Sequence, residues 1–339
     1  MAYKKATYSG PGALARGLHE FITTLGNGEA WSLVWGSAPT TANTQVKQCV
    51  YENKGSVGTD KIYVGVEFNF NEGLQQYYIM LRGIQGVNLS AGDLRGHYNV
   101  SEGAVISLGG SNFQFETRLF ANSRRFMLHT LFGSYSQMLY GGLAVPIARP
   151  TEYPYPLVVF GNMTEDRTLG QKSTSSRITY VETRFIYNCD GWLAGYTNFQ
   201  IFLPDNTWQG GYSISGASYR SDPPIGVYPW TVGAGGYTNK TISGTNSKSA
   251  FEPASTTSGM MQVYYENFAD SNMGPLLEQN YIRRRVNKYT DQVLGSLEGI
   301  RGIIGSKVAG SEITDENGVK HYVIASANDP SKVSALEMQ

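Results

Sequence analysis

The sequence predicts a mostly β protein, with a β-sandwich or barrel-like core, one N-terminal α-helix and a loop-rich second lobe. Apolar side chains alternate with polar ones in several segments, which is the pattern of strands with one buried face. Turn-forming residues separate these segments, and glycine is abundant, at 40 of 339 residues. Together the alternation and the turns favour many short strands over helices.

The first element predicted is a short amphipathic helix from Ala13 to Leu25. Leu14, Leu18 and Ile22 recur at helical spacing, and the run Gly26–Gly28 ends the pattern. The apolar face of this helix is expected to pack on the strands that follow.

Strands are predicted next at 31–35, 48–52, 60–70, 76–84 and 104–108, with a loop over 85–103. The clearest is 60–70, where five apolar side chains share one face: Ile62, Val64, Val66, Phe68 and Phe70. The turn at 71–73 makes 76–84 its hairpin partner.

The stretch from Phe113 to Gly161 holds the densest set of apolar and aromatic side chains. It predicts strands at 113–119 and 126–132, joined by a turn at Asn122. Beyond them, four prolines keep the backbone extended; they are Pro146, Pro150, Pro154 and Pro156.

Composition predicts three parts: a helix plus β core over 1–165, a Gly/Ser/Thr-rich lobe or insertion over 166–275, and a C-terminal segment over 276–339. The lobe is expected to contain a strand at 180–187. Residues 276–294 are compatible with a helix. The end of the chain predicts a β-hairpin, with a turn at 314–318 and a returning strand at 320–325.

Charge disfavours a nucleic-acid partner, because 27 basic residues balance 27 acidic ones and leave no net positive field. Only 16% of residues are charged, which suits a surface covered by neighbouring proteins or an ordinary turn-rich β protein. No run approaches the roughly 18–20 apolar residues of a membrane span. We expect a cytoplasmic chain without an export signal, with Cys49 and Cys189 as reduced, partly buried thiols.

The sequence predicts no catalytic, cofactor or metal site, because it carries none of the familiar local motifs. The four histidines are scattered, and His19 and His129 are expected to be structural. An enzyme that cuts polysaccharides stays open as an alternative, since its carboxylate pair leaves no local motif. The acidic residues on or beside strands are Glu67, Glu116, Glu182, Asp190 and Asp205.

Several aromatic residues stand among Gly, Ser and Asn in the predicted lobe, chiefly Trp192, Trp208, Tyr212 and Trp230. Exposed aromatic rings can stack on sugars, anchor a protein interface or form a small core. A receptor- or carbohydrate-binding role for residues 190–257 therefore stays open beside an interface role.

Four motifs resemble virion structural proteins of tailed bacteriophages: GTDKIYVGV at 58–66, YIMLRG at 78–83, FANSRRF at 120–126 and LYGGLAVPIARPTEYPYPL at 139–157. The C-terminal segment from Leu294 to Ile324 is similar to the same group. The resemblance covers roughly 1–165 and 285–339. It implies a component of a contractile phage tail, at or near the baseplate, that acts in assembly and not in catalysis.

Under that resemblance the chain is expected to form a symmetric ring of its own copies, to contact other tail and baseplate proteins, and to reside in the virion after assembly in the host cytoplasm. The expected contact residues lie in the proline-rich run: Arg149, Tyr153, Pro154, Tyr155 and Pro156. Prolines hold this run extended before docking, which lowers the entropy lost on binding. The alternative is that the run covers its own sheet.

Overall fold

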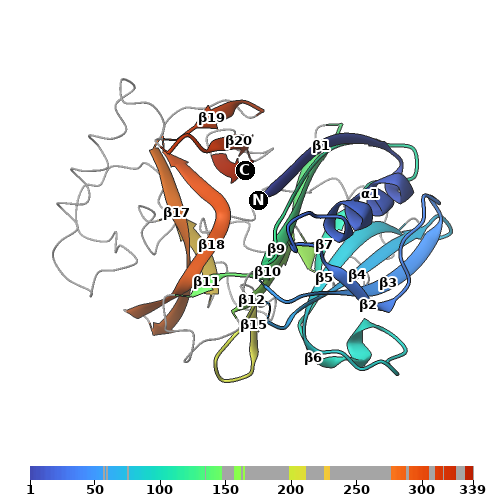
Figure 1. The fold of residues 1–339 in the computed structure, drawn as a ribbon, viewed down its shortest axis with the longest axis horizontal. Helices are drawn as coiled ribbons and strands as arrows, with labels where there is room; N and C mark the ends of the chain where they lie inside the picture. The colour runs from blue at the N-terminus through green and yellow to red at the C-terminus, as the bar shows by residue number, and fades with distance from the viewer. Residues whose placement is uncertain are drawn as a thin grey trace. The chain divides into compact units, whose positions relative to one another are not determined.

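The computed structural model confirms a mostly β protein with one α-helix near the N-terminus (Figure 1). It describes residues 1–55, 58, 60–74, 76–133, 135–146, 156–161, 163–164, 198–210, 225–229, 276–287, 290–304, 310–315, 317–325 and 333–338. These form two compact units. The first takes the described residues of Met1–Leu143, Tyr153–Phe185 and Tyr196–Gly210, and the second takes the others.

The first unit contains two seven-stranded sheets, both antiparallel. Sheet A has the order β1 (Ala2–Ser9), β8 (Gln114–Ala121), β9 (Arg125–Phe132), β10 (Tyr135–Leu143), β12 (Leu157–Gly161), β14 (Asn198–Phe202), β15 (Trp208–Gly210). Sheet B has the order β13 (Met163–Thr164), β7 (Ala104–Ser107), β5 (Gln76–Gly86), β4 (Ile62–Asn71), β3 (Gln45–Asn53), β2 (Ser32–Gly36), with β6 (Tyr98–Val100) beside β5.

The two sheets pack face to face around one hydrophobic core. Sheet B contributes the predicted face of β4, from Ile62 to Phe70, all fully buried. Sheet A contributes alternating residues of β8 and β9, including Phe115, Leu119 and Leu128. Each fully buried side chain of this kind stabilises the fold by about 1.5–3 kcal/mol. The sandwich predicted from alternation is therefore confirmed in this unit.

Helix α1 (Pro11–Thr23) packs its apolar face, Leu14, Leu18 and Ile22, into the same core. Proline suits its first turn, where the missing N–H has no intrahelical partner. The helix lacks a local side-chain cap, but Asn43 Oδ1 accepts the Gly12 N–H at 3.0 Å. A residue distant in sequence thus caps the helix, which ties its start to the loop before β3.

Sheets A and B of the first unit are joined at several points, and two of them involve β7. Gln137 of β10 is fully buried, and its amide accepts the Ser107 N–H at 2.8 Å and donates to the Ser107 carbonyl oxygen on β7. At the sandwich corner, one residue separates β12 in sheet A from β13 in sheet B. Gly161 makes this crossing possible, because a Cβ there would lie 2.8 Å from the Val105 backbone.

The second unit contains sheet C, with the order β16 (Ile225–Pro229), β17 (Leu276–Asn287), β18 (Thr290–Ile304), β21 (Val333–Glu337), β20 (Lys320–Ala325), β19 (Glu312–Thr314). Strand β11 (Val145–Pro146) also pairs with β18. The predicted hairpin near the C-terminus is confirmed as β19–β20. There Asp315 Oδ1 accepts the N–H groups of Asn317 and Val319, both at 2.9 Å, which fixes the turn.

The helix considered for residues 276–294 is wrong, because β17 and β18 form a long antiparallel hairpin there. The register of this hairpin shifts at three points, between Gln279 and Tyr281, between Ile282 and Arg283, and between Arg285 and Asn287. Each irregularity changes the phase of the two-residue alternation. The apolar spacing along the strand therefore imitates a helix.

The predicted segments at 31–35, 48–52, 60–70, 76–84, 104–108, 113–119 and 126–132 are confirmed as strands. Strand β1 was not predicted, and the loop at 85–103 also holds a 3₁₀ turn, η1 (Leu94–Gly96), and β6. The strand expected at 180–187 lies outside the described residues. The three-part division stays a prediction, because most of 166–275 also lies outside them.

Candidate assembly surfaces

The run of prolines connects strands of two different sheets. We name residues 147–156 the proline arm. Before it, β11 pairs Val145 with Ser296 and Pro146 with Gly295 in sheet C. After it, Leu157 pairs with Leu143 in sheet A. The arm is therefore anchored at both ends.

Of the five candidate contact residues, the structure describes Pro156, which is buried. Arg149, Tyr153, Pro154 and Tyr155 lie outside the described residues, so their contact role stays a prediction. The burial of Pro156 shows that the last residue of the arm belongs to the chain's own fold. A contact role for the rest of the arm stays a prediction for residues 147–155.

The glycine pair of the motif at 139–157 is required by packing in the first unit. A Cβ on Gly141 would lie 3.0 Å from Val64 Cγ1 of sheet B. Gly142 has a φ of +150°, and a Cβ there would fall 2.4 Å from the Arg124 carbonyl oxygen. This part of the motif therefore has a structural cause.

The motif at 120–126 is a tight hairpin between β8 and β9. Asn122 Oδ1 accepts the N–H groups of Arg124 and Arg125, at 2.9 and 3.0 Å, in an Asx turn. The Asn122 carbonyl oxygen accepts the indole N–H of buried Trp31 at 2.9 Å. The hairpin is thereby fixed to the segment that enters β2.

Trp208 is seated in the fold of the first unit. Its Nε1–H donates to the Asn99 carbonyl oxygen at 2.9 Å, and its ring centroid lies 5.3 Å from that of Phe202. Asn99 Nδ2 in turn donates to the Asn206 carbonyl oxygen at 2.9 Å. The half-buried indole therefore joins the β14–β15 hairpin to the segment between β5 and β7.

The other three aromatic candidates, Trp192, Tyr212 and Trp230, lie outside the described residues. The Trp208 N–H donates to a backbone carbonyl oxygen, and its ring packs against Phe202, so both make contacts within the fold. A sugar-binding role for the aromatic set stays a prediction that now depends on those three residues.

Sequence reasoning missed two exposed apolar side chains in one segment, Leu89 in the loop after β5 at 77% exposure and Tyr98 at the start of β6 at 62%. They stand in a Gly/Asn/Asp-rich segment, where neither alternation nor helical spacing marks them. Other large apolar side chains with substantial exposure are Val46, Leu74, Phe113 and Val145. Single exposed apolar residues are normal on a protein surface, so none of these alone marks a binding site.

Sheet A is largely buried on both faces. On the face opposite the sandwich core, Tyr140 stacks on Phe160 with ring centroids 5.3 Å apart, and Phe160 lies 6.4 Å from Phe199. All three rings are nearly fully buried. Double-sided burial is why strand β12, with the sequence LVVFG, reads as a continuous apolar run.

Buried His129 lies on the same face of sheet A. Its Nε2 is 2.9 Å from Ser136 Oγ, and the two share a hydrogen bond. Burial, with the Arg118 guanidinium nearby, lowers the pKa of His129 to about 3. The ring therefore stays neutral at physiological pH, which is compatible with the structural role predicted from its place in a strand.

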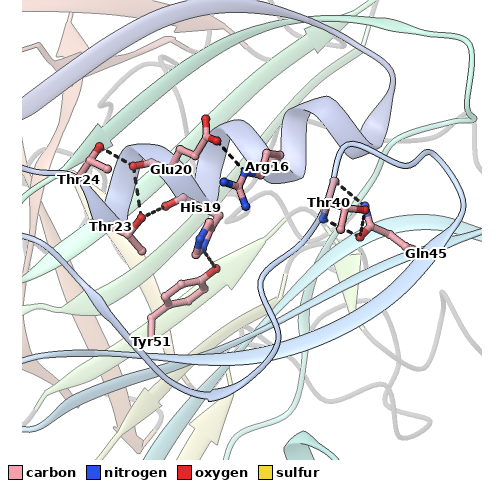
Figure 2. A network of polar contacts seen from close by, with 8 residues as sticks. All are labelled: Arg16, His19, Glu20, Thr23, Thr24, Thr40, Gln45 and Tyr51. Atoms are coloured by element: carbon pink, nitrogen blue, oxygen red, sulfur yellow. Dashed lines mark hydrogen bonds and ion pairs between the residues drawn. The ribbon is translucent and has the colours of Figure 1, made fainter.

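A second polar group lies beneath α1, where His19 Nδ1 and the Tyr51 hydroxyl are 2.8 Å apart (Figure 2). Burial and the nearby Arg16 lower the pKa of His19. Burial raises the pKa of Tyr51, and it raises the pKa of the fully buried Cys49 thiol to about 12. Because a thiolate is the reactive form, Cys49 is inert near neutral pH.

The described carboxylates among the candidates already have protein partners. Glu67 accepts hydrogen bonds from Tyr78 and Gln48, both at 2.6 Å. Glu116 lies 2.8 Å from Arg118 Nη2, and Asp205 accepts the Thr207 N–H at 3.1 Å. Glu182 and Asp190 lie outside the described residues.

The described residues hold no group of three or more His, Cys, Asp or Glu side chains placed to bind a metal ion. In the same part of the chain, no helix has the length and hydropathy needed to cross a membrane.

Comparison with known proteins gave neither a matching family model nor a matching curated protein.

Proposed function

We propose that this chain is a structural subunit of a bacteriophage tail or baseplate, which forms a symmetric ring and connects tube, sheath and baseplate proteins. The resemblance of the four sequence motifs supports this assignment. The low charged content of 16% also suits a surface covered by neighbours. The chain would assemble in the host cytoplasm and reside in the virion tail.

The anchoring of the proline arm supports the proposal most. Strands β11 and β12 fix its two ends, and prolines restrict the backbone between them. A segment restricted in this way loses less conformational entropy when it docks. Tyr153 and Tyr155 then offer aromatic side chains of the kind that dominate binding at interfaces.

Replacing both tyrosines tests the arm, as Tyr153→Ala with Tyr155→Ala. We expect the urea unfolding midpoint to stay at the wild-type value, while sedimentation velocity shows loss of the oligomer. Tyr98→Ala is the matched control, since it removes an exposed tyrosine outside the arm. Loss of monomer stability in the double variant would instead assign the arm to the chain's own fold.

A further inference from the structure

His97 closes the neck of a surface loop in the first unit. We name residues 87–97 the latch loop. Its two ends meet just beyond the β5–β6 ladder, whose last pair is Gly86 with Tyr98. There Asn88 donates its backbone N–H to His97 Nδ1 at 3.0 Å. This hydrogen bond joins the two ends of the loop, beside a second, exposed one from Asn88 Nδ2 to the Gly96 carbonyl oxygen at 3.1 Å.

The latch loop covers a small apolar cluster on the face of sheet B that points away from the sandwich core. Leu94, at the centre of the loop, is buried with Val50 and Ile84, and Trp35 packs against them. The Leu94 N–H donates to Gln48 Oε1 of β3 at 3.2 Å. Opening the loop would therefore expose apolar surface on sheet B.

The hydrogen bond fixes the protonation state of His97. A backbone N–H can only donate, so Nδ1 must carry a lone pair, and in the neutral ring the proton sits on Nε2. His97 is 6% exposed, and its Nε2 is buried without a hydrogen-bond partner among the described residues. The ring stands perpendicular to Trp35, with centroids 4.7 Å apart.

We propose that His97 is a proton-sensitive latch, which holds the loop closed while its ring is neutral and releases it when Nδ1 takes up a proton. A protonated Nδ1 would present an N–H to the Asn88 N–H, so the closing hydrogen bond is lost. The positive ring would also lie in a buried, largely apolar site, where no described carboxylate is paired with it.

The surroundings of the His97 ring, taken together, also favour its neutral form. Burial lowers the pKa of His97, whereas Asp93, in the loop itself, opposes this. Arg95 is the other charged residue of the loop. Trp35 of β2 and the Asn88 backbone contribute no charge. The closed loop therefore excludes the proton, and its stability falls as the pH drops below about 6.5, the ordinary value for a histidine.

Hydrogen exchange of residues 86–98, measured by mass spectrometry and corrected for the intrinsic rate at each pH, tests the latch. In the wild-type chain, the open population should rise by up to about tenfold for each pH unit below about 6.5. His97→Asn keeps an acceptor near the Nδ1 position but cannot titrate, so its loop should stay closed in acid. His97→Leu removes the acceptor, and its loop should exchange fast at every pH.

His19→Asn serves as the control, because it removes a different partly buried histidine and should leave the wild-type response intact. A wild-type loop whose protection is constant between about pH 7.5 and about pH 4.5 would overturn the proposal. So would acid opening in His97→Asn, or a protected loop in His97→Leu. Protection of β4 that falls as steeply with pH as that of the loop would mark global unfolding as the cause and would also overturn it.

Discussion

The indole of Trp208 lies directly on the backbone of Gly83. A Cβ built on Gly83 would fall 2.1 Å from Trp208 Cη2, so only glycine fits beneath the ring. Gly83 belongs to β5 of sheet B, and Trp208 begins β15 of sheet A. The pair therefore fastens an edge hairpin of one sheet to a central strand of the other.

Gly83→Ala should destabilise the protein by about 1–3 kcal/mol, because the added methyl group must displace the indole. Chemical denaturation measures this change. Gly86→Ala, three residues later in β5, is the control: its Cβ would lie 3.2 Å from the exposed Tyr98 ring, which can move. We expect that control to cost less than about 0.5 kcal/mol.

A double-mutant cycle sharpens the Gly83 prediction. In a Trp208→Ala background the methyl group meets no ring, so Gly83→Ala should become nearly neutral, with a coupling energy of about 1–3 kcal/mol. Equal costs in both backgrounds would show that the ring is not what excludes a methyl group at this position.

Much of the sandwich follows from the sequence because its strands keep one face in one core. The alternation from Ile62 to Phe70 predicted both the strand and its buried face. Strand β1 escaped prediction because it is an edge strand whose side chains, including Lys4 and Lys5, are largely exposed. In β17, bulges disturb the alternation, so local spacing pointed to a helix.

The candidate surfaces were harder to predict, since they depend on contacts between distant segments. The sequence marked Trp208 as an unusual aromatic residue but could not show its pairing with Gly83 and Asn99. The proline pattern predicts an extended arm, which stays a prediction because residues 147–155 lie outside the described residues. The anchoring of the arm depends on β11, a strand of only two residues. Such a short strand leaves no periodic signal.

Gln137→Leu should destabilise the first unit by at least about 2 kcal/mol. The substitution leaves both the N–H and the carbonyl oxygen of Ser107 without their buried partner, at about 1–3 kcal/mol each. Gln114→Leu, at the exposed first residue of β8, is the matched control and should change stability by less than about 0.5 kcal/mol. Similar unfolding midpoints for the two variants would contradict the buried amide bridge.

His129 should make the protein acid-sensitive. Its pKa is lowered to about 3 in the fold, so the unfolded chain binds a proton that the folded chain refuses. Stability is then complete above about pH 6.5 and falls by up to about 1.4 kcal/mol per pH unit below it, until the pH approaches 3. Urea unfolding over this pH range, compared between wild type and His129→Gln, isolates the contribution of His129 to the pH dependence of the unfolding free energy. Parallel curves for the two proteins would refute it.

Cys49 should not react with a maleimide near pH 7 while the protein is folded. Burial raises the pKa of its thiol to about 12, and the side chain is inaccessible. A Cys189→Ser background isolates Cys49, and mass spectrometry counts the labels. We expect labelling only after denaturant is added. Rapid labelling of the native protein would show that β3 opens or that the thiol is exposed.

Electron microscopy of the purified protein tests the proposed assembly most directly. A ring-forming tail subunit should give closed particles with a single rotational symmetry at concentrations that favour association. Particles of monomer size at every concentration would contradict a ring built from copies of this chain.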